Sequence, residues 1–295
     1  MSDLQSKVKT IGKAVLPKKL AGFISGCRYR GSIAHIDYVL KLRKYRARHT
    51  KANATAPSSI IVLPGSCTIR ILPDDDVRDA FEHFCWRDPE MVDEFVGFMK
   101  LSSSRKVLWD VGALFGMFSL AFSLKRAGCK ALAFEPNPSS AAKLEECLKL
   151  NPEANVEIFR SAVGLPGEVI EFERGFHYTA VAGLPARPAE NNLTRTETVS
   201  IDALVERGLY PPDVVKIDVE GHEFEVLKGA KKLLLTKKPL LSIELHPGLL
   251  QHRGTSALAI AEFLEEAGYV FQDTGLRRVK KEFFDRRNNF RAFAS

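Results

Sequence analysis

The segment KVLWDVGALFG (residues 106–116) joins an apolar run of strand type to a turn that contains two glycines. A strand that ends in such a turn and continues into a helical pattern is typical of a β-α-β unit. Gly112 and Gly116 allow the backbone to turn sharply and to approach a ligand closely. The segment therefore predicts a ligand-binding turn at the carboxyl end of a buried strand.

Strand-like runs alternate with helical patterns over the rest of the chain. The helical patterns cover residues 116–127 and 138–150, and the further strand-like runs are KALAFE (130–135), NVEIF (155–159), DVVKID (213–218), PLLSIEL (239–245) and YVFQD (269–273). This alternation predicts an open α/β sheet of parallel strands, with right-handed crossovers and helices on both faces. Ligands of such sheets bind beyond the carboxyl ends of the strands.

The region before this sheet contains shorter signals. Two β-rich runs, 60–63 and 68–72, flank Pro64-Gly65-Ser66 and predict a hairpin. Pro89 predicts the first turn of a helix that runs to about residue 100. The polar stretch TKANATAPSS (50–59) is typical of a linker. We expect an N-terminal extension, partly helical, over 1–55 and a main domain over 56–295.

The net charge of +7 is concentrated in the N-terminal arm. Residues 1–51 hold 13 of the 43 basic residues against Asp3 and Asp37, so the rest has 30 basic and 34 acidic residues. A basic arm with apolar residues at helical spacing favours peripheral contact with an anionic membrane or a polyanion, although a charge run is more often only a solvated surface. Because the remainder is net acidic, we expect no nucleic-acid partner.

Composition excludes several classes of protein. A chain of 295 residues with 45% hydrophobic and 27% charged residues is an ordinary globular protein, not a collagen or a disordered chain. No apolar stretch approaches the roughly 18 residues of a membrane-spanning helix, and we expect a cytoplasmic protein. No C-x-x-C spacing occurs among the cysteines, which predicts reduced thiols; they are Cys27, Cys67, Cys85, Cys129 and Cys147.

The acidic residues at the strand ends indicate the cofactor. Asp110 would repel a pyrophosphate, and Leu114 stands where a dinucleotide fingerprint has its second glycine, which argues against a dehydrogenase. An acid at this turn suits an ammonium or a sulfonium, as in S-adenosylmethionine. Glu135 follows Gly112 by 23 residues, where a carboxylate commonly accepts both ribose hydroxyls of an adenosine.

Ionisable residues at the ends of two later strands are candidates for catalysis. Transfer of a methyl group to a hydroxyl needs an aligned nucleophile and a group that accepts its proton. The candidates are Asp218, Glu220, His222, Glu244 and His246. Asp218 and His246 are favoured over Glu223, because Glu220 to Glu223 are also typical of a helix start. A Mg²⁺, Mn²⁺ or Zn²⁺ site is the less favoured alternative, since no fixed ligand spacing supports it; we therefore expect no metal.

An ordered set of motifs resembles the FkbM family of S-adenosylmethionine-dependent methyltransferases over about residues 60–273. The motifs are DVGALFG (110–116), AFEPNP (133–138), SAVG (161–164), TVSIDALV (198–205), VVKIDVEGHEFEVLKGA (214–230) and SIELHP (242–247). The resemblance implies a class I methyltransferase sheet with Rossmann-like topology and an antiparallel last strand, for which residues 289–294 are available. It also implies O-methylation of sugars, of glycolipid or polysaccharide residues, or of hydroxylated metabolites.

The resemblance assigns roles to residues of the matched motifs. It implies that Asp110, Gly112, Ala113 and Gly116 hold the methionine part of the cofactor and that Glu135 holds the ribose. The adenine side falls to Asn137, Ser161 and Ala162, and Asp218, Glu220, Glu244 and His246 lie near the transferred methyl group. Leu114 departs from the family, which usually has Asn at this position, so its contact with the cofactor is in question.

Two further interpretations complete the sequence-based prediction. Residues 176–198 are long, polar and without periodicity, which predicts a mobile loop over the cleft, with Phe176, His177 and Tyr178 able to stack on a sugar ring. The alternatives to an O-methyltransferase are a non-catalytic cofactor-binding module that docks through its basic arm, and a nucleic-acid methyltransferase. The acceptor and the oligomeric state stay open.

Overall fold

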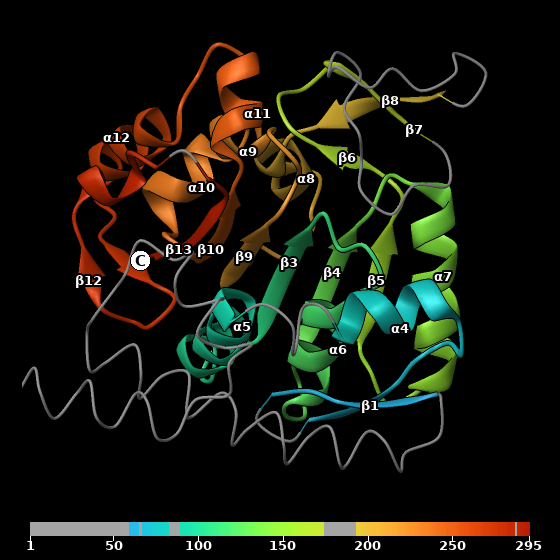
Figure 1. The fold of residues 1–295 in the computed structure, drawn as a ribbon. Helices are drawn as coiled ribbons and strands as arrows, with labels where there is room; N and C mark the ends of the chain where they lie inside the picture. The colour runs from blue at the N-terminus through green and yellow to red at the C-terminus, as the bar shows by residue number, and fades with distance from the viewer. Residues whose placement is uncertain (1–58, 65–66, 83–88, 174–192, 287) are drawn as a thin grey trace, which may run out of the picture. The chain divides into compact units, whose positions relative to one another are not determined.

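A computed structural model describes residues 59–64, 67–82, 89–173, 193–286 and 288–295 (Figure 1). All of these residues belong to one compact unit. The basic arm, Cys85 and the residues Phe176, His177 and Tyr178 lie outside the described residues, so the predictions about them stay predictions.

The centre of this unit is an eight-stranded sheet. In spatial order its strands are β12 (Arg278–Val279), β11 (Phe271–Asp273), β13 (Phe290–Ala294), β10 (Leu240–Leu245), β9 (Val214–Ile217), β3 (Val107–Val111), β4 (Lys130–Phe134) and β5 (Val156–Phe159). Parallel pairing joins β10, β9, β3, β4 and β5. The sheet confirms the predicted open and mostly parallel α/β architecture.

The last strand runs against its neighbours. β13 pairs antiparallel with β10 and with β11 and so fills the place between them. This confirms the antiparallel last strand that the family resemblance implied for residues 289–294. Its insertion brings Arg291 beside Glu244 of β10.

Helices cover both faces of the sheet (Figure 1). The helices before β10 are α4 (Asp75–Glu82), α5 (Pro89–Leu101), α6 (Met117–Leu124), α7 (Pro138–Leu150), α8 (Ile201–Glu206), α9 (Glu223–Lys228) and α10 (Lys231–Thr236). Those after it are α11 (Pro247–His252), α12 (Ala257–Glu266) and the short 3₁₀ helix η3 (Lys281–Phe284). Helices α5 and α7 confirm the predicted ranges, whereas α6 ends before the predicted residue 127.

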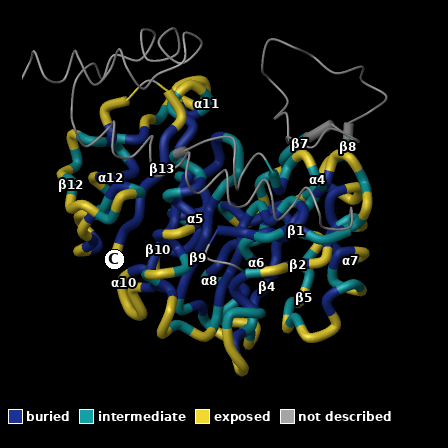
Figure 2. Tube along the Cα trace, turned by 60° about the horizontal axis from the view of Figure 1, so that its bottom comes forward, coloured by how far each residue is buried: buried dark blue, intermediate teal, exposed yellow. Residues whose placement is uncertain are grey.

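The strand sequences place alternate side chains in two different cores. Trp109 and Val111 of β3 belong to the cluster formed with α9 and α12, whereas Leu108, which precedes them, packs with α5 and α6. Successive side chains of a strand point to opposite faces, so a continuous apolar run suits a sheet that is covered on both sides. Figure 2 shows the central strands β9 and β10 as buried, with the exposed residues on the outer helices and loops.

An antiparallel hairpin precedes the sheet, as predicted. It consists of β1 (Ile60–Val62) and β2 (Thr68–Arg70). Helix α4, which follows it, was not predicted. The carboxylate of Asp74 accepts hydrogen bonds from the N–H groups of Asp76 and Val77, and this N-cap followed by acidic residues is the signal that marks the helix.

A three-stranded sheet lies between β5 and α8 in the chain. Its order is β6 (Ala162–Val163), β8 (Leu193–Val199) and β7 (Val169–Glu173). The predicted loop over 176–198 is therefore wrong at its C-terminal end, because residues 193–197 pair with β7 and Thr198 pairs with β6. The alternating sequence LTRTETV suits such a half-covered strand.

Several minor expectations can also be compared with the structure. Trp109 is fully buried in the core and donates its indole N–H to the carbonyl of Tyr210. Cys67, Cys129 and Cys147 are free thiols, and the last two are buried. Among the described residues, no helix combines the length and the apolar character needed to cross a bilayer.

Candidate active site

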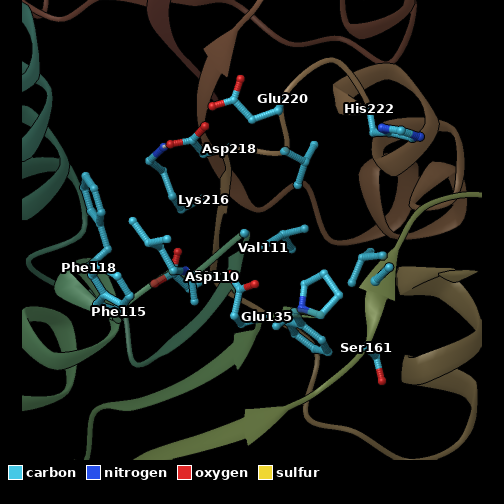
Figure 3. A pocket seen from close by; sticks show the side chains of 18 of the residues that line it. Asp110, Val111, Phe115, Phe118, Glu135, Ser161, Lys216, Asp218, Glu220 and His222 are labelled. Atoms are coloured by element: carbon cyan, nitrogen blue, oxygen red, sulfur yellow. Dashed lines mark hydrogen bonds and ion pairs between the residues drawn. The ribbon is translucent and has the colours of Figure 1, made fainter. Parts of the chain in front are cut away.

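A pocket opens at the carboxyl ends of β3, β4 and β9 (Figure 3). Helices α4 and α6 contribute part of its wall through Phe81 and Phe118. The predicted site residues that line it are Asp110, Gly112, Ala113, Leu114, Glu135, Ser161, Ala162, Asp218, Glu220 and His222. The structure thus brings together residues that are more than 100 positions apart in the chain.

The turn after β3 makes a close backbone contact with the residue that follows β9. Gly112 has a φ of +82°, and a Cβ atom there would lie 1.8 Å from the carbonyl oxygen of Asp218. The N–H groups of Gly112 and Ala113 both donate to the carbonyl of Phe134. Only glycine fits this conformation and this approach, so the turn is fixed between its two neighbouring strands.

Two predicted cofactor residues have structural positions outside the pocket wall. Gly116, with a φ of +78°, precedes α6, and a Cβ atom there would lie 2.2 Å from a side-chain carbon of Leu144. Asn137 is the N-cap of α7 and accepts a hydrogen bond from the N–H of Ser139. Both residues lie behind the pocket wall, where they fix the starts of α6 and α7.

Glu135 connects the two cofactor-side segments. One of its carboxylate oxygens accepts the N–H of Leu114 at 2.8 Å, and the other accepts the N–H of Asn137 at 2.8 Å. Burial raises the pKa of Glu135 to about 7, although these two hydrogen bonds act in the opposite direction. Each carboxylate oxygen has a further lone pair, so Glu135 retains the capacity to accept two hydroxyl donors.

Leu114 takes part in this arrangement through its main chain. Its φ of 49° is in the left-handed region, which Asn adopts more readily than Leu. Its N–H donates to Glu135, and its side chain packs at the edge of an apolar cluster with Phe115 and Phe81. The departure from the family residue therefore leaves the backbone contact in place.

Asp110 is buried at the base of the pocket. One of its oxygens accepts the N–H of Ser119 at 3.1 Å and the hydroxyl of Ser119 at 2.7 Å. Burial raises the pKa of Asp110 to about 6, against the lowering effect of Ser119 and of the Lys216 charge. A cationic ligand in the pocket would favour the ionised form of this carboxyl group.

The pocket has an acidic lining. Its carboxyl groups are those of Asp110, Glu135, Glu171, Asp218 and Glu220, and among the described lining residues Lys216 is the one with an ammonium group. This excess of carboxyl groups over ammonium groups disfavours a phosphate, because a phosphate is also negatively charged. It fits a ligand that carries an ammonium and a sulfonium together with a ribose diol, as expected from the sequence.

Four of the predicted catalytic residues converge at the ends of β9 and β10. Asp218 and Glu220 line the pocket, whereas Glu244 and His246 are buried and do not belong to its lining. Nε2 of His246 lies 3.4 Å from a carboxylate oxygen of Glu220 and 3.9 Å from one of Glu244. Burial acts to raise the pKa of Asp218, but the Lys216 and His246 charges outweigh it and hold that pKa below its usual value. Asp218 is therefore ionised near neutral pH.

Glu223 is a site residue that the sequence analysis ranked too low. It was interpreted as an acid of an ordinary helix start, yet its side chain is 0% exposed. Its Oε1 lies 2.8 Å from Nδ1 of His246 and accepts the N–H of Gly221 at 2.8 Å. Burial acts to lower the pKa of His246, but the bond to Glu223 reverses this effect and the pKa rises to about 9.

A buried charge network behind the pocket was also missed. The Lys216 ammonium lies 3.3 Å from Glu94 of α5 and 3.6 Å from Asp218, and Arg291 forms ion pairs with Glu94 and Glu244. A lysine inside a continuous apolar strand was a readable signal for Lys216. Glu94 and Arg291 gave no such signal, since only the tertiary structure brings α5 and β13 to β9 and β10.

Glu244 belongs to this network and differs from the other acids. Burial and the charge of Asp218 raise the pKa of Glu244 well above its usual value. It shares a hydrogen bond with Asp218. The charge of Arg291, which pairs with Glu244, acts in the opposite direction, so this carboxyl group lies between a cation and a neighbouring carboxylate.

His222 and Ser161 line the pocket but point elsewhere. The His222 ring lies apart from the Asp218 and Glu220 carboxylates, and the Ser161 hydroxyl points away from the other labelled side chains (Figure 3). Burial and the charge of Arg253 lower the pKa of His222 to about 4. A neutral imidazole in this position is a weak candidate for the proton acceptor.

The strand order, the antiparallel β13 and the strand-end pocket define a class I methyltransferase fold. More particularly, the chain belongs to the FkbM methyltransferase family, because residues 110–271 match the methyltransferase FkbM domain. This agrees with the resemblance inferred from the motifs.

One relative agrees with this assignment, and solved structures match the chain more distantly. The hexuronic acid methyltransferase AglP of Haloferax volcanii is 34% identical over 184 residues, which cover 62% of this chain and 71% of that protein. The solved structure of methyltransferase FkbM from Methylobacillus flagellatus KT is 18% identical, with a TM-score of 0.43 over 65% of this chain. The match covers 43% of that longer protein.

A second solved structure covers a similar part of the chain. It is precorrin-6y C5,15-methyltransferase from Geobacter metallireducens GS-15, which is 16% identical with a TM-score of 0.40. The match covers 68% of this chain and 86% of that protein.

Proposed function

We propose that this protein is an S-adenosylmethionine-dependent O-methyltransferase that acts on a hydroxyl group of a sugar, free or within a glycan or glycolipid. The observation that carries this proposal is the buried Glu135 carboxylate beside the Gly112 turn, in a pocket lined by acids. AglP is named for a hexuronic acid acceptor, which supports a uronic acid or a related sugar as the acceptor here.

The residues of the chain divide between the two substrates. Asp110 is placed to face the ammonium of the cofactor and Glu135 to accept the ribose hydroxyls. When bound, the cofactor supplies an electrophilic methyl group on a sulfonium. Asp218, Glu220 and His246 are placed to bind and orient the acceptor hydroxyl.

The transfer is a displacement at the methyl carbon. Asp110 and Glu135 would hold the cofactor so that its methyl carbon faces the acceptor oxygen in line with the leaving sulfur. The hydroxyl proton is released beside Asp218, Glu220 and His246 and passes to water. Since Asp218 is held ionised, it can accept a hydrogen bond from the attacking hydroxyl without first losing a proton.

Calorimetry and a transfer assay test the two halves of the proposal. We expect the purified chain to bind S-adenosylhomocysteine and to transfer labelled methyl groups from S-adenosylmethionine to uronic acid glycosides. Absence of S-adenosylhomocysteine binding at high protein concentration would contradict the cofactor site. Binding without transfer to any sugar in a broad screen would contradict the acceptor class.

The N-terminal arm contributes a separate proposal. Its 13 basic residues over positions 1–51 support contact with an anionic membrane at the site of a lipid-linked acceptor in the cytoplasm. The boundary near residue 55 gives the natural truncation. Vesicles that contain phosphatidylglycerol should retain the full chain and release the chain that lacks 1–55, and equal retention of both would contradict this docking.

A further inference from the structure

Three side chains at the acceptor end of the pocket converge on one point. One ligand atom from each of Asp218, Glu220 and His246 lies within 4.8 Å of the others. Asp218 and Glu220 line the pocket and bring their carboxylates to the same side of it (Figure 3). His246 is 3% exposed and lies on the protein side of the set. The set is therefore accessible from the pocket through Asp218 and Glu220 and is buried at His246.

The imidazole of His246 has the orientation that is usual for metal-ligating histidines. Its Nδ1 lies 2.8 Å from the fully buried Glu223, while Nε2 faces Glu220 at 3.4 Å. Histidines that bind metals almost always donate their second N–H to a carboxylate or a carbonyl, which fixes the tautomer and the ring plane. Glu223 lies outside the set of three and holds the Nδ1 side of His246 in this way. An ion bound at Nε2 would displace the proton that the imidazolium carries there near neutral pH.

A second observation indicates that an oxygen-bearing ligand belongs beside this set. The ammonium of Lys216 is 2% exposed and lies 3.6 Å from Asp218, toward which it points (Figure 3). Its Nζ makes no hydrogen bond to any described residue, although ion pairs surround it. A buried ammonium without hydrogen bonds is costly, and a ligand oxygen near Asp218 would satisfy it.

We propose that Asp218, Glu220 and His246 form a divalent-cation site that binds the acceptor through its oxygen atoms, with Lys216 as a donor to the same ligand. The proposal rests on the proposed function, since it concerns the acceptor of that reaction. It revises the expectation that no metal takes part. The sequence alone could not decide this, because the three ligands follow two different strands and have no fixed spacing.

A divalent cation would compensate the negative charge of the pocket. A uronic acid would bring a further carboxylate into a lining that already holds five carboxyl groups. A divalent cation offsets this repulsion and bridges the protein carboxylates to the sugar. It also favours ionisation of a bound hydroxyl, whose proton then passes to water.

The site combines carboxylate and imidazole ligands, and this combination determines which ions are suitable probes. Two carboxylates favour Mn²⁺ or Mg²⁺, and an imidazole favours Zn²⁺ or Fe²⁺. We would titrate the full chain, first stripped with EDTA, with Mn²⁺ and follow the free ion by electron paramagnetic resonance, and would repeat the titration calorimetrically with Zn²⁺. Saturable binding of one ion per chain is expected for at least one of them, and saturable binding of neither would overturn the proposal.

Site-directed variants test whether the ion binds at this set. Asp218→Asn, Glu220→Gln and His246→Gln should each weaken ion binding at least tenfold, and Glu223→Gln should weaken it about 10- to 100-fold. Glu225→Gln is the matched control, because Glu225 lies on the same helix and pairs with Lys228. Equal ion binding in the wild type and the three ligand variants would overturn the proposal.

A measurement on the unaltered protein avoids any folding defect of the variants. Bound Mn²⁺ should show coupling to the nitrogen of an imidazole in pulsed electron paramagnetic resonance. Bound Mn²⁺ without nitrogen coupling would exclude His246 as a ligand and overturn the three-residue site. D-glucuronate should bind the chain in the presence of Mn²⁺ and at least tenfold more weakly in EDTA, and equal binding would overturn the acceptor role of the ion.

Cofactor binding distinguishes a failure of the cation proposal from a failure of the proposed function. S-adenosylhomocysteine should bind with the same affinity in EDTA and in Mn²⁺, because Glu135 and Asp110 do not belong to the ion set. Loss of this binding in both conditions would contradict the proposed function itself. Retained S-adenosylhomocysteine binding without an ion site would overturn only the cation proposal.

Discussion

The α-carbon of Gly112 and the carbonyl oxygen of Asp218 are so close that a Cβ on the glycine would lie 1.8 Å from that oxygen. The contact joins the turn after β3 to the end of β9. It therefore links the proposed cofactor residues to the proposed acceptor residues through the backbone, independently of any side chain.

Replacement of Gly112 should disrupt both parts of the site. Gly112→Ala must move β9 or the turn and must also accept a left-handed conformation, which costs about 1–2 kcal/mol for a residue with a Cβ atom. We expect S-adenosylhomocysteine affinity to fall at least tenfold in calorimetry. Gly128→Ala is the control, because Gly128 has a φ of +80° and nothing within 4 Å of an added Cβ. Similar losses in both variants would show that strain alone, and not the contact with Asp218, is responsible.

Cofactor affinity should depend on pH through Glu135. Ribose hydroxyls donate to the ionised carboxylate, and burial raises the pKa of Glu135 to about 7. Affinity for S-adenosylhomocysteine should therefore weaken about tenfold from pH 8 to pH 6, with proton release on binding at pH 6.5. Glu135→Gln should bind more weakly and lose most of this dependence, whereas Glu157→Gln on β5 should keep it. A flat profile in the wild type would contradict the assignment of Glu135 to the ribose.

Ionisation of Glu135 also affects the free energy of unfolding, and its effect is opposite to the effect on cofactor affinity. Because the folded pKa of Glu135 is raised above its ordinary value, its stabilising contribution is complete below that ordinary value and is lost as the pH rises through about 7. Urea unfolding of the ligand-free chain at pH 6 and pH 8 should show Glu135→Gln gaining stability relative to the wild type at the higher pH. An equal difference at both pH values would mean that the carboxyl group ionises normally.

Lys216 should be important for folding as well as for the site. Lys216→Met removes the cation beside the half-buried Asp218 carboxylate and leaves the buried Glu94 with Arg291 alone, which should destabilise the fold by about 3–5 kcal/mol. Lys130→Met removes a lysine from a partly exposed pair with Glu157 and should cost about 1 kcal/mol or less. Urea unfolding measures both, and equal small losses would show that the network around Lys216 is well solvated.

Leu114 tests whether the departure from the family matters. Leu114→Asn keeps the N–H that Glu135 accepts and suits the φ of 49° better, while some apolar packing is lost. We expect S-adenosylhomocysteine affinity to stay within about threefold of the wild type. An affinity change of more than tenfold would show that the side chain at this position contacts the cofactor directly.

Local signals were sufficient for most elements of the central sheet. The apolar run before Asp110, the glycines after it and the following helical pattern predicted β3, its turn and α6. The same alternation predicted β4, β9 and β10, because strands buried on both faces are apolar throughout. Helix α4 was missed although Asp74 marks its start, and β8 was missed because its sequence is polar and its partner is distant in the chain.

The cofactor side was also readable from the chain. Asp110 lies near the carboxyl end of β3, and Glu135 directly follows the neighbouring parallel strand β4, so the rule for strand ends places them in one pocket. The acceptor side was readable only in part. Asp218 and His246 follow strands and were predicted, but nothing local separates a helix-start acid from a residue buried against a histidine, so Glu223 was ranked too low.

The sequence by itself determined the order of the elements, the glycine turn and the acids at the strand ends, since these depend on local conformation and on the period of the apolar residues. Only the tertiary structure decided the ionisation and the partners of the buried charges. Lys216, Glu94 and Arg291 lie on β9, α5 and β13, far apart in the chain, and meet because β13 inserts between β10 and β11 while α5 packs on the sheet. Distances and burial set the energies of such charges, and these depend on how the elements pack together.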